Sequence, residues 1–185
     1  MKILLVRHAA ALARGTPGVL DAERPLTSTG TAAFRVAARG LARILGQVDV
    51  FVTSPLTRAR ETAEIAAIAF RRPEPVVEIA LAGKSLDAAI AALTVHRHET
   101  TVAVVGHEPM LRALLARMLG APDAERFAFR KGAAALVALP DGPAATGNLL
   151  WFLTPRVLQA LGDAEAFVPT VQSGNGGPVV RNIPS

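Results

Sequence analysis

Short apolar runs alternate with segments of helical periodicity over most of the chain, and this alternation limits the possible folds more than any other feature. Four apolar runs are expected to be strands, of which the third is the weakest: 2–6, 48–53, 76–79 and 101–105. The segments between and after them have the periodicity of helices: 28–45, 55–70, 85–96 and 109–119. Continuous apolar runs of this length are typical of strands buried on both faces. The alternation therefore predicts a three-layer α/β domain with helices on both faces of a mainly parallel sheet.

Local signals at the helix ends agree with these ranges. Thr27-Ser28 can cap the first helix. Pro55 suits the first turn of the second helix. In that second helix we expect Ile65, Ile68 and Ala69 to face inward.

The last third of the chain has a different pattern. Two strand-like runs, 133–139 and 149–153, flank a segment of turn residues and predict a hairpin with antiparallel pairing at one edge of the sheet. A short helix is expected at 155–161. We interpret residues 1–162 as one domain and residues 163–185 as a flexible tail, because the tail is rich in Gly and Pro.

Polar motifs follow three of the predicted strands at the point where each strand ends. The motifs are Arg7-His8, Ser54-Pro55-Leu56-Thr57-Arg58-Ala59 and Gly106-His107-Glu108-Pro109. In a parallel sheet the carboxyl ends of the strands meet at one edge. The sequence therefore places two histidines and two arginines at a shared edge, and this convergence indicates an enzyme.

The four side chains suit phosphoryl transfer. A transferring phosphoryl group spreads negative charge over its oxygens, and the planar guanidinium groups of Arg7 and Arg58 can bind those oxygens. His8 is the candidate nucleophile, because a neutral imidazole can accept a phosphoryl group near neutral pH. Arg7 beside it favours the neutral form. His107 can donate a hydrogen bond to a phosphoryl oxygen.

Each motif also has a structural interpretation when it is taken alone. An Arg-His pair after a strand is commonly a surface pair or a helix cap. Ser-Pro-x-x-Arg is commonly a helix start with a solvated arginine, and Gly-His-Glu-Pro is commonly a turn. The joint placement of all three motifs at one edge favours the catalytic interpretation.

The composition argues against several other functions. The chain has no cysteine, which excludes disulfides, thiolate metal sites and a cysteine nucleophile. Its formal charge of +5 favours anionic partners, yet tyrosine is absent and there is 1 tryptophan, so stacking platforms for nucleic acid are scarce. No apolar stretch is long enough to span a bilayer. We therefore expect a cytoplasmic protein without nucleic-acid or membrane partners.

Together the motifs resemble those of the histidine phosphatase superfamily, and most of all its SixA-type phosphohistidine phosphatases. The segments that carry the resemblance are Leu5-Val6-Arg7-His8, Arg24-Pro25-Leu26-Thr27 with Gly30, Ser54 to Ala59 with Glu61-Thr62-Ala63, Val105 to Pro109, Lys131-Gly132-Ala133 and Leu150 to Pro155. They span about residues 1 to 160. The resemblance implies a phosphoglycerate mutase-like fold, His8 as the phosphoryl acceptor, and a phosphate pocket formed by Arg7, Arg58 and His107. It implies no metal and no cofactor.

Ala9 departs from the superfamily pattern, which commonly has Gly after the Arg-His pair. Glycine permits backbone angles and a close approach that alanine resists. The substitution therefore bears on the shape of the pocket. SixA-like members have Ala there as well.

The proton donor for the leaving group has three candidates. Larger relatives take it from the segment after the third strand, where this chain offers Glu78; a solvated carboxylate is the alternative there. Glu108, beside His107, and Asp21, in the first loop, are the other two. Arg24, in the same loop, either adds to the phosphate site or forms a salt bridge.

We expect a phosphatase that transfers the phosphoryl group to His8 and then to water, releasing inorganic phosphate. An alkoxide needs a proton as it leaves, whereas a phosphorylated imidazole releases a nitrogen of low basicity. A weak general acid and a compact chain therefore favour a phosphohistidine protein as substrate. The alternatives are a small-molecule phosphomonoesterase, a mutase, and a phosphate-binding module without turnover.

Overall fold

The structure is a computed structural model, and it describes residues 1–164 of the 185-residue chain. Its strands are β1 (Lys2–Arg7), β2 (Val50–Thr53), β3 (Val76–Val77), β4 (Thr101–Gly106), β5 (Ala134–Ala138) and β6 (Asn148–Leu153). Its α-helices are α1 (Ser28–Leu45), α2 (Thr57–Ala69), α3 (Leu86–Thr94), α4 (Met110–Leu119) and α5 (Pro155–Asp163). Three short 3₁₀ helices are η1 (Asp21–Glu23), η2 (Ile79–Ala82) and η3 (Ala124–Phe127). The predicted tail lies outside the described residues from residue 165 onward.

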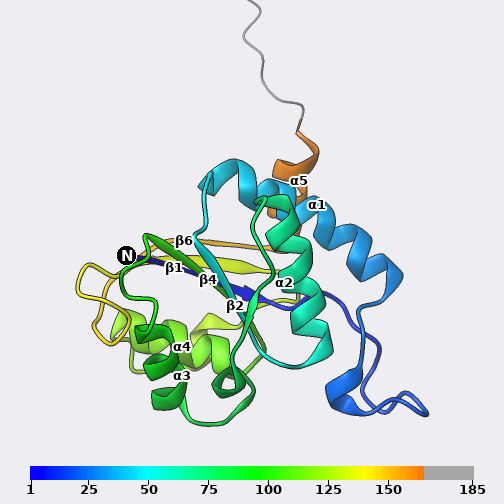
Figure 1. Cartoon of the computed structure of the whole chain (residues 1–185), viewed down its shortest axis with the longest axis horizontal. Helices are drawn as coiled ribbons and strands as arrows, with labels where there is room; N and C mark the ends of the chain where they lie inside the picture. Colours follow the sequence, from blue (N-terminus) through cyan, green and yellow to red (C-terminus); the bar gives the residue numbers. More distant parts are fainter. Residues whose placement is uncertain (165–185) are drawn as a thin grey trace, which may run out of the picture.

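The strands form one six-stranded sheet in the order β3-β2-β4-β1-β5-β6 (Figure 1). Strands β1 to β4 pair in parallel, and β5 pairs antiparallel with both β1 and β6. The predicted mainly parallel sheet with an antiparallel edge is thus confirmed. The carboxyl ends of β1, β2 and β4 meet at one edge, with Arg7 in register with Gly106 and Thr53 with Val105.

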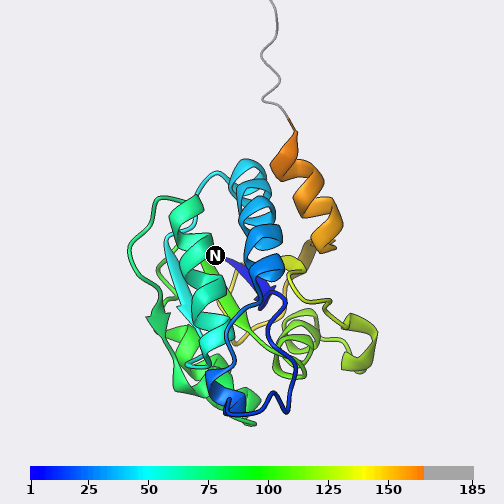
Figure 2. The ribbon, with the colours of Figure 1, turned by 90° about the vertical axis from the view of Figure 1, so that its right-hand side faces the viewer.

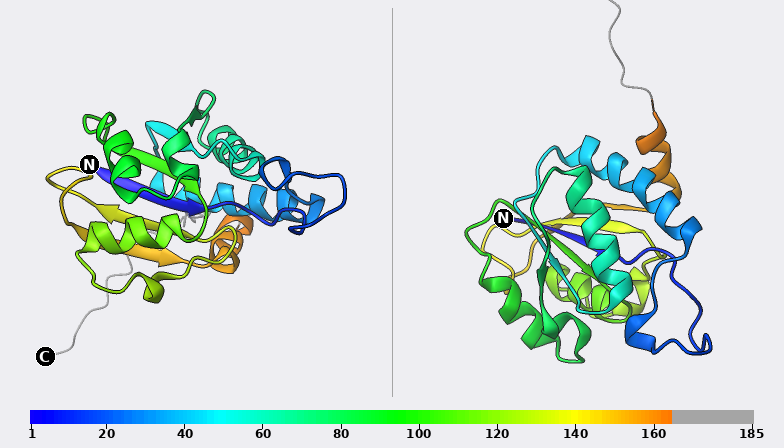
Figure 3. Two further views of the ribbon diagram at one scale, coloured as in Figure 1. Left: turned by 90° about the horizontal axis from the view of Figure 1, so that it is seen from below. Right: turned by 45° about the vertical axis from the view of Figure 1, so that its right-hand side comes forward.

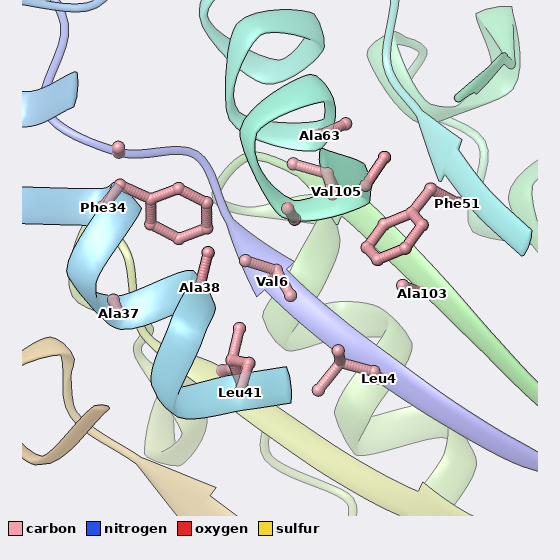
Figure 4. Packing of buried hydrophobic residues seen from close by; sticks show 14 of the residues in the cluster. Leu4, Val6, Phe34, Ala37, Ala38, Leu41, Phe51, Ala63, Ala103 and Val105 are labelled. Carbon is pink, nitrogen blue, oxygen red and sulfur yellow. The ribbon is translucent and has the colours of Figure 1, made fainter. Parts of the chain in front are cut away.

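Alternate residues of the central strands enter two separate hydrophobic cores. On β1, Leu4 and Val6 pack against α1, α2 and α5, while Ile3 and Leu5 pack against α3 and α4. Figure 4 shows the first core, in which Phe34 of α1 lies close to β1. Because successive strand residues point to opposite faces, a continuous apolar run supplies both cores. The three layers follow from this division.

Helices α1 and α5 pack side by side at one end of the molecule (Figure 2). Two glycines allow this close approach. A Cβ built on Gly40 would lie 2.1 Å from the carbonyl oxygen of Leu158, and one on Gly162 would lie 1.9 Å from that of Val36. Neither position has room for a side chain.

Several details differ from the predicted elements. Helix α2 begins at Thr57, so Pro55 lies before its first turn. Ile68 was expected to face inward, yet it is 76% exposed. The buried residues of α2 are Arg58, Thr62 and the four alanines Ala59, Ala63, Ala66 and Ala67. Ile68 lies about 100° around the helix from Ala67. The strand predicted at 76–79 is shorter: it pairs with β2 at Val76 and Val77, and Ile79 begins η2.

The segment from residue 8 to residue 27 joins β1 to α1 and extends beyond the carboxyl end of β1 (Figure 3). It contains η1, and the bridge between Ala11 and Leu26 closes its base. This segment therefore lies at the edge of the sheet where the polar motifs meet. Within residues 1–164, no helix is long and apolar enough to cross a membrane.

Candidate active site

The three motifs follow β1, β2 and β4 directly, and backbone hydrogen bonds continue the sheet into them. The amide of His8 donates to the carbonyl of Gly106 at 3.0 Å, and the amide of Ser54 donates to that of Val105 at 3.1 Å. The first residues beyond the strands are thus as firmly placed as the strands. The structure brings together His8, His107, Arg7 and Arg58, as the sequence predicts.

The His8 and His107 rings lie next to each other, with 5.2 Å between their centroids. His8 is 6% exposed, and its Nδ1 lies 2.7 Å from the carbonyl oxygen of Ala9. Since a carbonyl only accepts hydrogen bonds, Nδ1 carries the proton in this contact. The Nε2 atom of neutral His8 then holds the free lone pair.

Burial keeps both imidazoles neutral. It lowers the pKa of His8 to about 4, helped by the charges of Arg58 and Arg7 and opposed by the hydrogen bond to Ala9. Burial also lowers the pKa of His107 to about 3, together with charge on His8 and the two arginines. Desolvation disfavours the charged form of an imidazole. At neutral pH the site therefore combines neutral rings with permanent cations.

Ser54 fixes the second ring. Its Oγ lies 2.7 Å from Nε2 of His107, and it also accepts a 3.4 Å hydrogen bond from the amide of Leu56. Nδ1 of His107 is buried and has no hydrogen-bond partner among the described residues. This nitrogen is available for a bound group.

Arg7 and Arg58 are each held by a carbonyl at one nitrogen. Arg7 donates from Nη1 to the carbonyl of Phe129, and Arg58 donates from Nη1 to that of Asp21 at 2.7 Å. Their Nε atoms are buried and lack hydrogen-bond partners among the described residues. Because a buried donor without an acceptor is costly, these atoms are available to bind an anion.

Thr62 joins the segment that follows β1 to the first turn of α2. Its Oγ1 accepts from the amide of Ala9 at 3.0 Å and donates to the carbonyl of Arg58 at 2.6 Å. Ala9 has ordinary backbone angles: within the described residues, Arg71 is the one non-glycine residue with a positive φ. Alanine therefore causes no backbone strain at the position where the superfamily commonly has glycine.

Asp21 lies at the centre of three arginines. Its Oδ1 is 3.0 Å from Nε of Arg14 and 3.0 Å from Nη2 of Arg24, and its Oδ2 is 3.5 Å from Nη2 of Arg58. The hydrogen bond from Arg14 lowers the pKa of Asp21 below its ordinary value, and the charges of Arg24 and Arg58 add to this. Asp21 is thus held ionised, and Arg24 forms the salt bridge that the sequence left as one of two alternatives.

The other two carboxylates also have structural partners. Glu78 accepts a 2.9 Å hydrogen bond from the amide of Ala80 and caps η2. Glu108 accepts a 2.8 Å hydrogen bond from the amide of Phe129 and lies 3.4 Å from Nε of Arg112. The structure places Glu108 beside the candidate site, whereas Glu78 does not line the cleft described next.

A cleft of about 610 Å³ adjoins the histidine pair. Arg58, His107, Asp21 and Glu108 are among the residues that line it. Its walls are largely apolar and come from η2, from the starts of α3 and α4, and from the residues just before α2 and α4. They include Leu56, Leu81, Leu86, Pro109, Met110 and Ala113. Arg14 and Lys84 add two exposed cations to its lining. The cleft can therefore hold the rest of a phosphorylated molecule.

Sequence reasoning assigned no separate role to several residues that shape this site. Ser54 and Thr62 stand in the quoted motifs, so the motifs were the available signal. Arg14 carries no motif signal. Phe129 contributes only its main-chain carbonyl and amide. Because every residue has these groups, the sequence gives no sign of such a role.

Comparisons with known proteins agree with this geometry. The sequence pattern of the histidine phosphatase superfamily (branch 1) matches residues 3–82. An uncharacterized protein of Picosynechococcus sp. is 37% identical over 116 residues, which cover 60% of this chain and 68% of that protein.

Solved structures extend the likeness to most of the chain. The protein histidine phosphatase SixA in complex with tungstate superposes with a TM-score of 0.73 at 25% identity, over 85% of this chain and 99% of that one. A Nakamurella multipartitia protein, provisionally named phosphohistidine phosphatase SixA, has a TM-score of 0.68 at 29% identity, over 83% and 95%. An Entamoeba histolytica phosphoserine phosphatase shares the fold, with a TM-score of 0.64 at 14% identity, over 84% and 98%.

The chain therefore belongs to the histidine phosphatase superfamily, whose fold it shares. Within that superfamily it is of the SixA type, and its activity is that of a phosphatase, a hydrolase acting on a phosphate-bearing substrate.

Proposed function

We propose that this phosphatase works through a phosphohistidine intermediate on His8. The observation that carries the proposal is the 2.7 Å contact between Nδ1 of His8 and the Ala9 carbonyl. It leaves the lone pair on Nε2, and the lowered pKa of about 4 keeps that lone pair available at neutral pH. An imidazole in this state is a competent phosphoryl acceptor.

The remaining three residues form the phosphate pocket in this proposal. Within residues 1–164, Nε of Arg7, Nε of Arg58 and Nδ1 of His107 have no hydrogen-bond partners, and phosphoryl oxygens would supply acceptors for them. The two guanidinium groups provide permanent positive charge where negative charge develops in the transition state. The scheme assigns no step to a metal.

The reaction has two steps. First, Nε2 of His8 forms a bond to phosphorus while the bond from phosphorus to the leaving group breaks. Water then attacks phosphorus, the phosphorus–nitrogen bond breaks, and inorganic phosphate leaves as His8 regains its lone pair. A proton from the attacking water passes to solvent or to phosphate.

A phosphohistidine protein is the substrate that these contacts favour. Asp21 is ionised by its arginines, Glu78 caps η2, and Glu108 is engaged by Phe129 and Arg112. In this proposal none of the three is the proton donor for an alkoxide, although Oε2 of Glu108 makes no hydrogen bond within residues 1–164. A nitrogen leaving group of low basicity departs without such help.

A small phosphate ester is the second candidate. The cleft of about 610 Å³ has the size of a small-molecule site, and the phosphoserine phosphatase above has the same fold. For this candidate, a carboxylate of the cleft would have to exchange its present partners for the leaving oxygen. The leaving group of an aryl phosphate needs less protonation than that of an alkyl phosphate. Comparing the rates on the two esters therefore shows whether a carboxylate supplies a proton to the leaving oxygen.

The test compares wild type with His8→Ala, and with His98→Ala as a matched control at an exposed histidine. The substrates are a phosphorylated histidine phosphotransfer domain, an aryl phosphate and phosphoserine, all in the presence of EDTA. We expect turnover by wild type and His98→Ala, none by His8→Ala, and a base-stable, acid-labile phosphoenzyme in wild type.

The ratio of rates chooses the substrate class. Preference for the phosphorylated domain supports the first candidate, and preference for phosphoserine supports the second. Turnover that survives in His8→Ala overturns the intermediate. Phosphate binding without any turnover overturns the enzymatic proposal and leaves a phosphate-binding module.

A further inference from the structure

The segment from Phe129 to Ala133 holds both Arg7 and His8 in place. The Phe129 carbonyl accepts from the Arg7 guanidinium. The amide of Gly132 donates to the carbonyls of Arg7 and His8, at 3.1 Å each, and the carbonyl of Ala133 accepts from the amide of Arg7 at 3.0 Å. The position of the Arg7 head group is therefore set by the backbone at Phe129.

Glu108 sets that backbone in turn. Its Oε1 accepts a hydrogen bond from the Phe129 amide at 2.8 Å. The amide of Phe129 thus binds Glu108, while the carbonyl of the same residue binds Arg7. Phe129 is 1% exposed, so its packing in the core also holds the residue in place. Glu108 follows His107 directly, and it thus joins the end of β4 to the segment that holds Arg7.

Arg112 keeps the Glu108 carboxylate in this orientation. Arg112 lies four residues after Glu108, in the first turn of α4. Its Nε is 3.4 Å from Oε2 of Glu108, and its Nη1 pairs with Glu125. The Glu108 side chain is 18% exposed. Its Oε1 is therefore hydrogen-bonded to the Phe129 amide, whereas its buried Oε2 has the Arg112 guanidinium nearby and makes no hydrogen bond within residues 1–164.

We propose that Glu108 is a positioning residue, which holds Arg7 on the phosphoryl group through the backbone of Phe129, and that it does not donate the proton. The inference rests on the proposed function, because it takes Arg7 as a phosphate ligand. It assigns to Glu108 a task that the sequence left open.

The two roles differ in what a substitution does. A proton donor matters more as the leaving group becomes more basic, and it matters little for binding an inert anion. A positioning residue matters equally for every leaving group and also for binding an inert anion. Gln keeps the acceptor oxygen for the Phe129 amide but offers no acidic proton.

The experiment measures kcat and KM for an aryl phosphate and an alkyl phosphate, the Kd of sulfate, and the Tm. The variants are Glu108→Gln, Glu108→Ala and Glu108→Asp, whose shorter side chain does not reach Phe129. Glu99→Gln, at an exposed position, is the control.

We expect Glu108→Ala and Glu108→Asp to weaken sulfate binding and to lower kcat/KM by about tenfold to a hundredfold, equally for both substrates. Glu108→Gln should keep most of the activity. The Asp variant carries the test if the Ala variant does not fold.

Three results overturn the inference. The first is a loss in Glu108→Gln that is larger for the alkyl phosphate with unchanged sulfate binding, which identifies a proton donor. The second is a lowered Tm with unchanged Kd and kcat in the folded protein, which identifies a structural residue. The third is strict additivity with Arg7→Ala in a double-mutant cycle, because residues that act through one another are not additive.

The same cycle separates this inference from the proposed function. If Arg7→Ala alone leaves sulfate binding and turnover unchanged, then the role of Arg7 in the proposed function is wrong. If Arg7→Ala abolishes both while the Glu108 variants do not, only the positioning role is wrong.

Discussion

The hydroxyl of Ser54 lies 2.7 Å from Nε2 of His107 and leaves Nδ1 of that ring as the nitrogen that faces no partner in the described part of the chain. Ser54 is fully buried and follows β2, whereas His107 follows β4. Ser54 also accepts from the Leu56 amide, and we expect its own proton to go to Nε2 of His107. The proton of neutral His107 would then sit on Nδ1, where it can be donated to a phosphoryl oxygen.

Ser54→Ala should therefore impair catalysis without removing any group that touches phosphate. The His107 ring loses its partner, so the two neutral tautomers become mixed and the ring less fixed. We expect kcat to fall about tenfold or more, by analogy with the loss of a residue that orients another ligand. Steady-state kinetics with an aryl phosphate and nitrogen NMR of the His107 ring measure this.

Ser28→Ala, at an exposed serine in α1, is the matched control for Ser54→Ala. It should leave both the rate and the ring spectrum unchanged. An unaltered His107 tautomer in Ser54→Ala would show that Ser54 does not orient the ring.

The two buried imidazoles should make the fold less stable as the pH is lowered. Their pKa values are about 4 and about 3 in the folded protein, against an ordinary value of 6.5. The unfolded chain therefore binds more protons between pH 6.5 and those values, so the free energy of unfolding decreases as pH falls through this window. Between pH 7 and pH 5 the expected loss is about 1–2 kcal/mol per histidine.

Urea unfolding at pH 7 and at pH 5 tests the pH effect. The loss should shrink in His8→Asn and in His107→Asn, but persist in His98→Asn. An identical loss in all four proteins would mean that the two histidines do not titrate as their burial requires.

An inert dianion should take up protons when it binds. Sulfate stays fully ionised over the pH range in question, so any proton taken up belongs to the protein. Its negative charge favours the protonated forms of His8 and His107 and raises their pKa values. Calorimetry at pH 5 in buffers of different ionisation enthalpy should show net uptake, with less uptake in His107→Asn. Proton release on binding would contradict the assignment.

Gly40→Ala and Gly162→Ala should destabilise the packing of α1 on α5. Each new Cβ would meet a backbone carbonyl at 2.1 Å or 1.9 Å, so the helices must move apart. Overpacking of this kind costs about 1–3 kcal/mol, and thermal unfolding measures it. Ala32→Ser adds one atom at an exposed position of α1 and should leave the Tm nearly unchanged. Unchanged Tm values in both glycine variants would rule out the close contact.

Much of this molecule is determined by local sequence. Apolar runs such as the one that ends at Val6 form strands because each buries side chains on both faces of the sheet. Arg7, His8, Arg58 and His107 come together because parallel strands end at a common edge. Helix faces are harder to predict, as Ile68 shows. The face of α2 that packs on the sheet contains the small residues Ala63 and Ala66, and periodicity alone does not indicate that small residues are buried in preference to Ile68.

Only the tertiary structure decided the partners of the site residues. The carbonyl that holds Arg7 belongs to Phe129, which lies 122 positions away in the sequence and uses backbone atoms common to every residue. The hydrogen-bond and ion-pair partners of Asp21, Glu78 and Glu108 depended likewise on which amides and guanidinium groups the fold brings to each. The sequence thus determines which groups reach the edge of the sheet, because strand pairing is a regular pattern. Their hydrogen bonds depend on loops, whose path is set by contacts between distant segments.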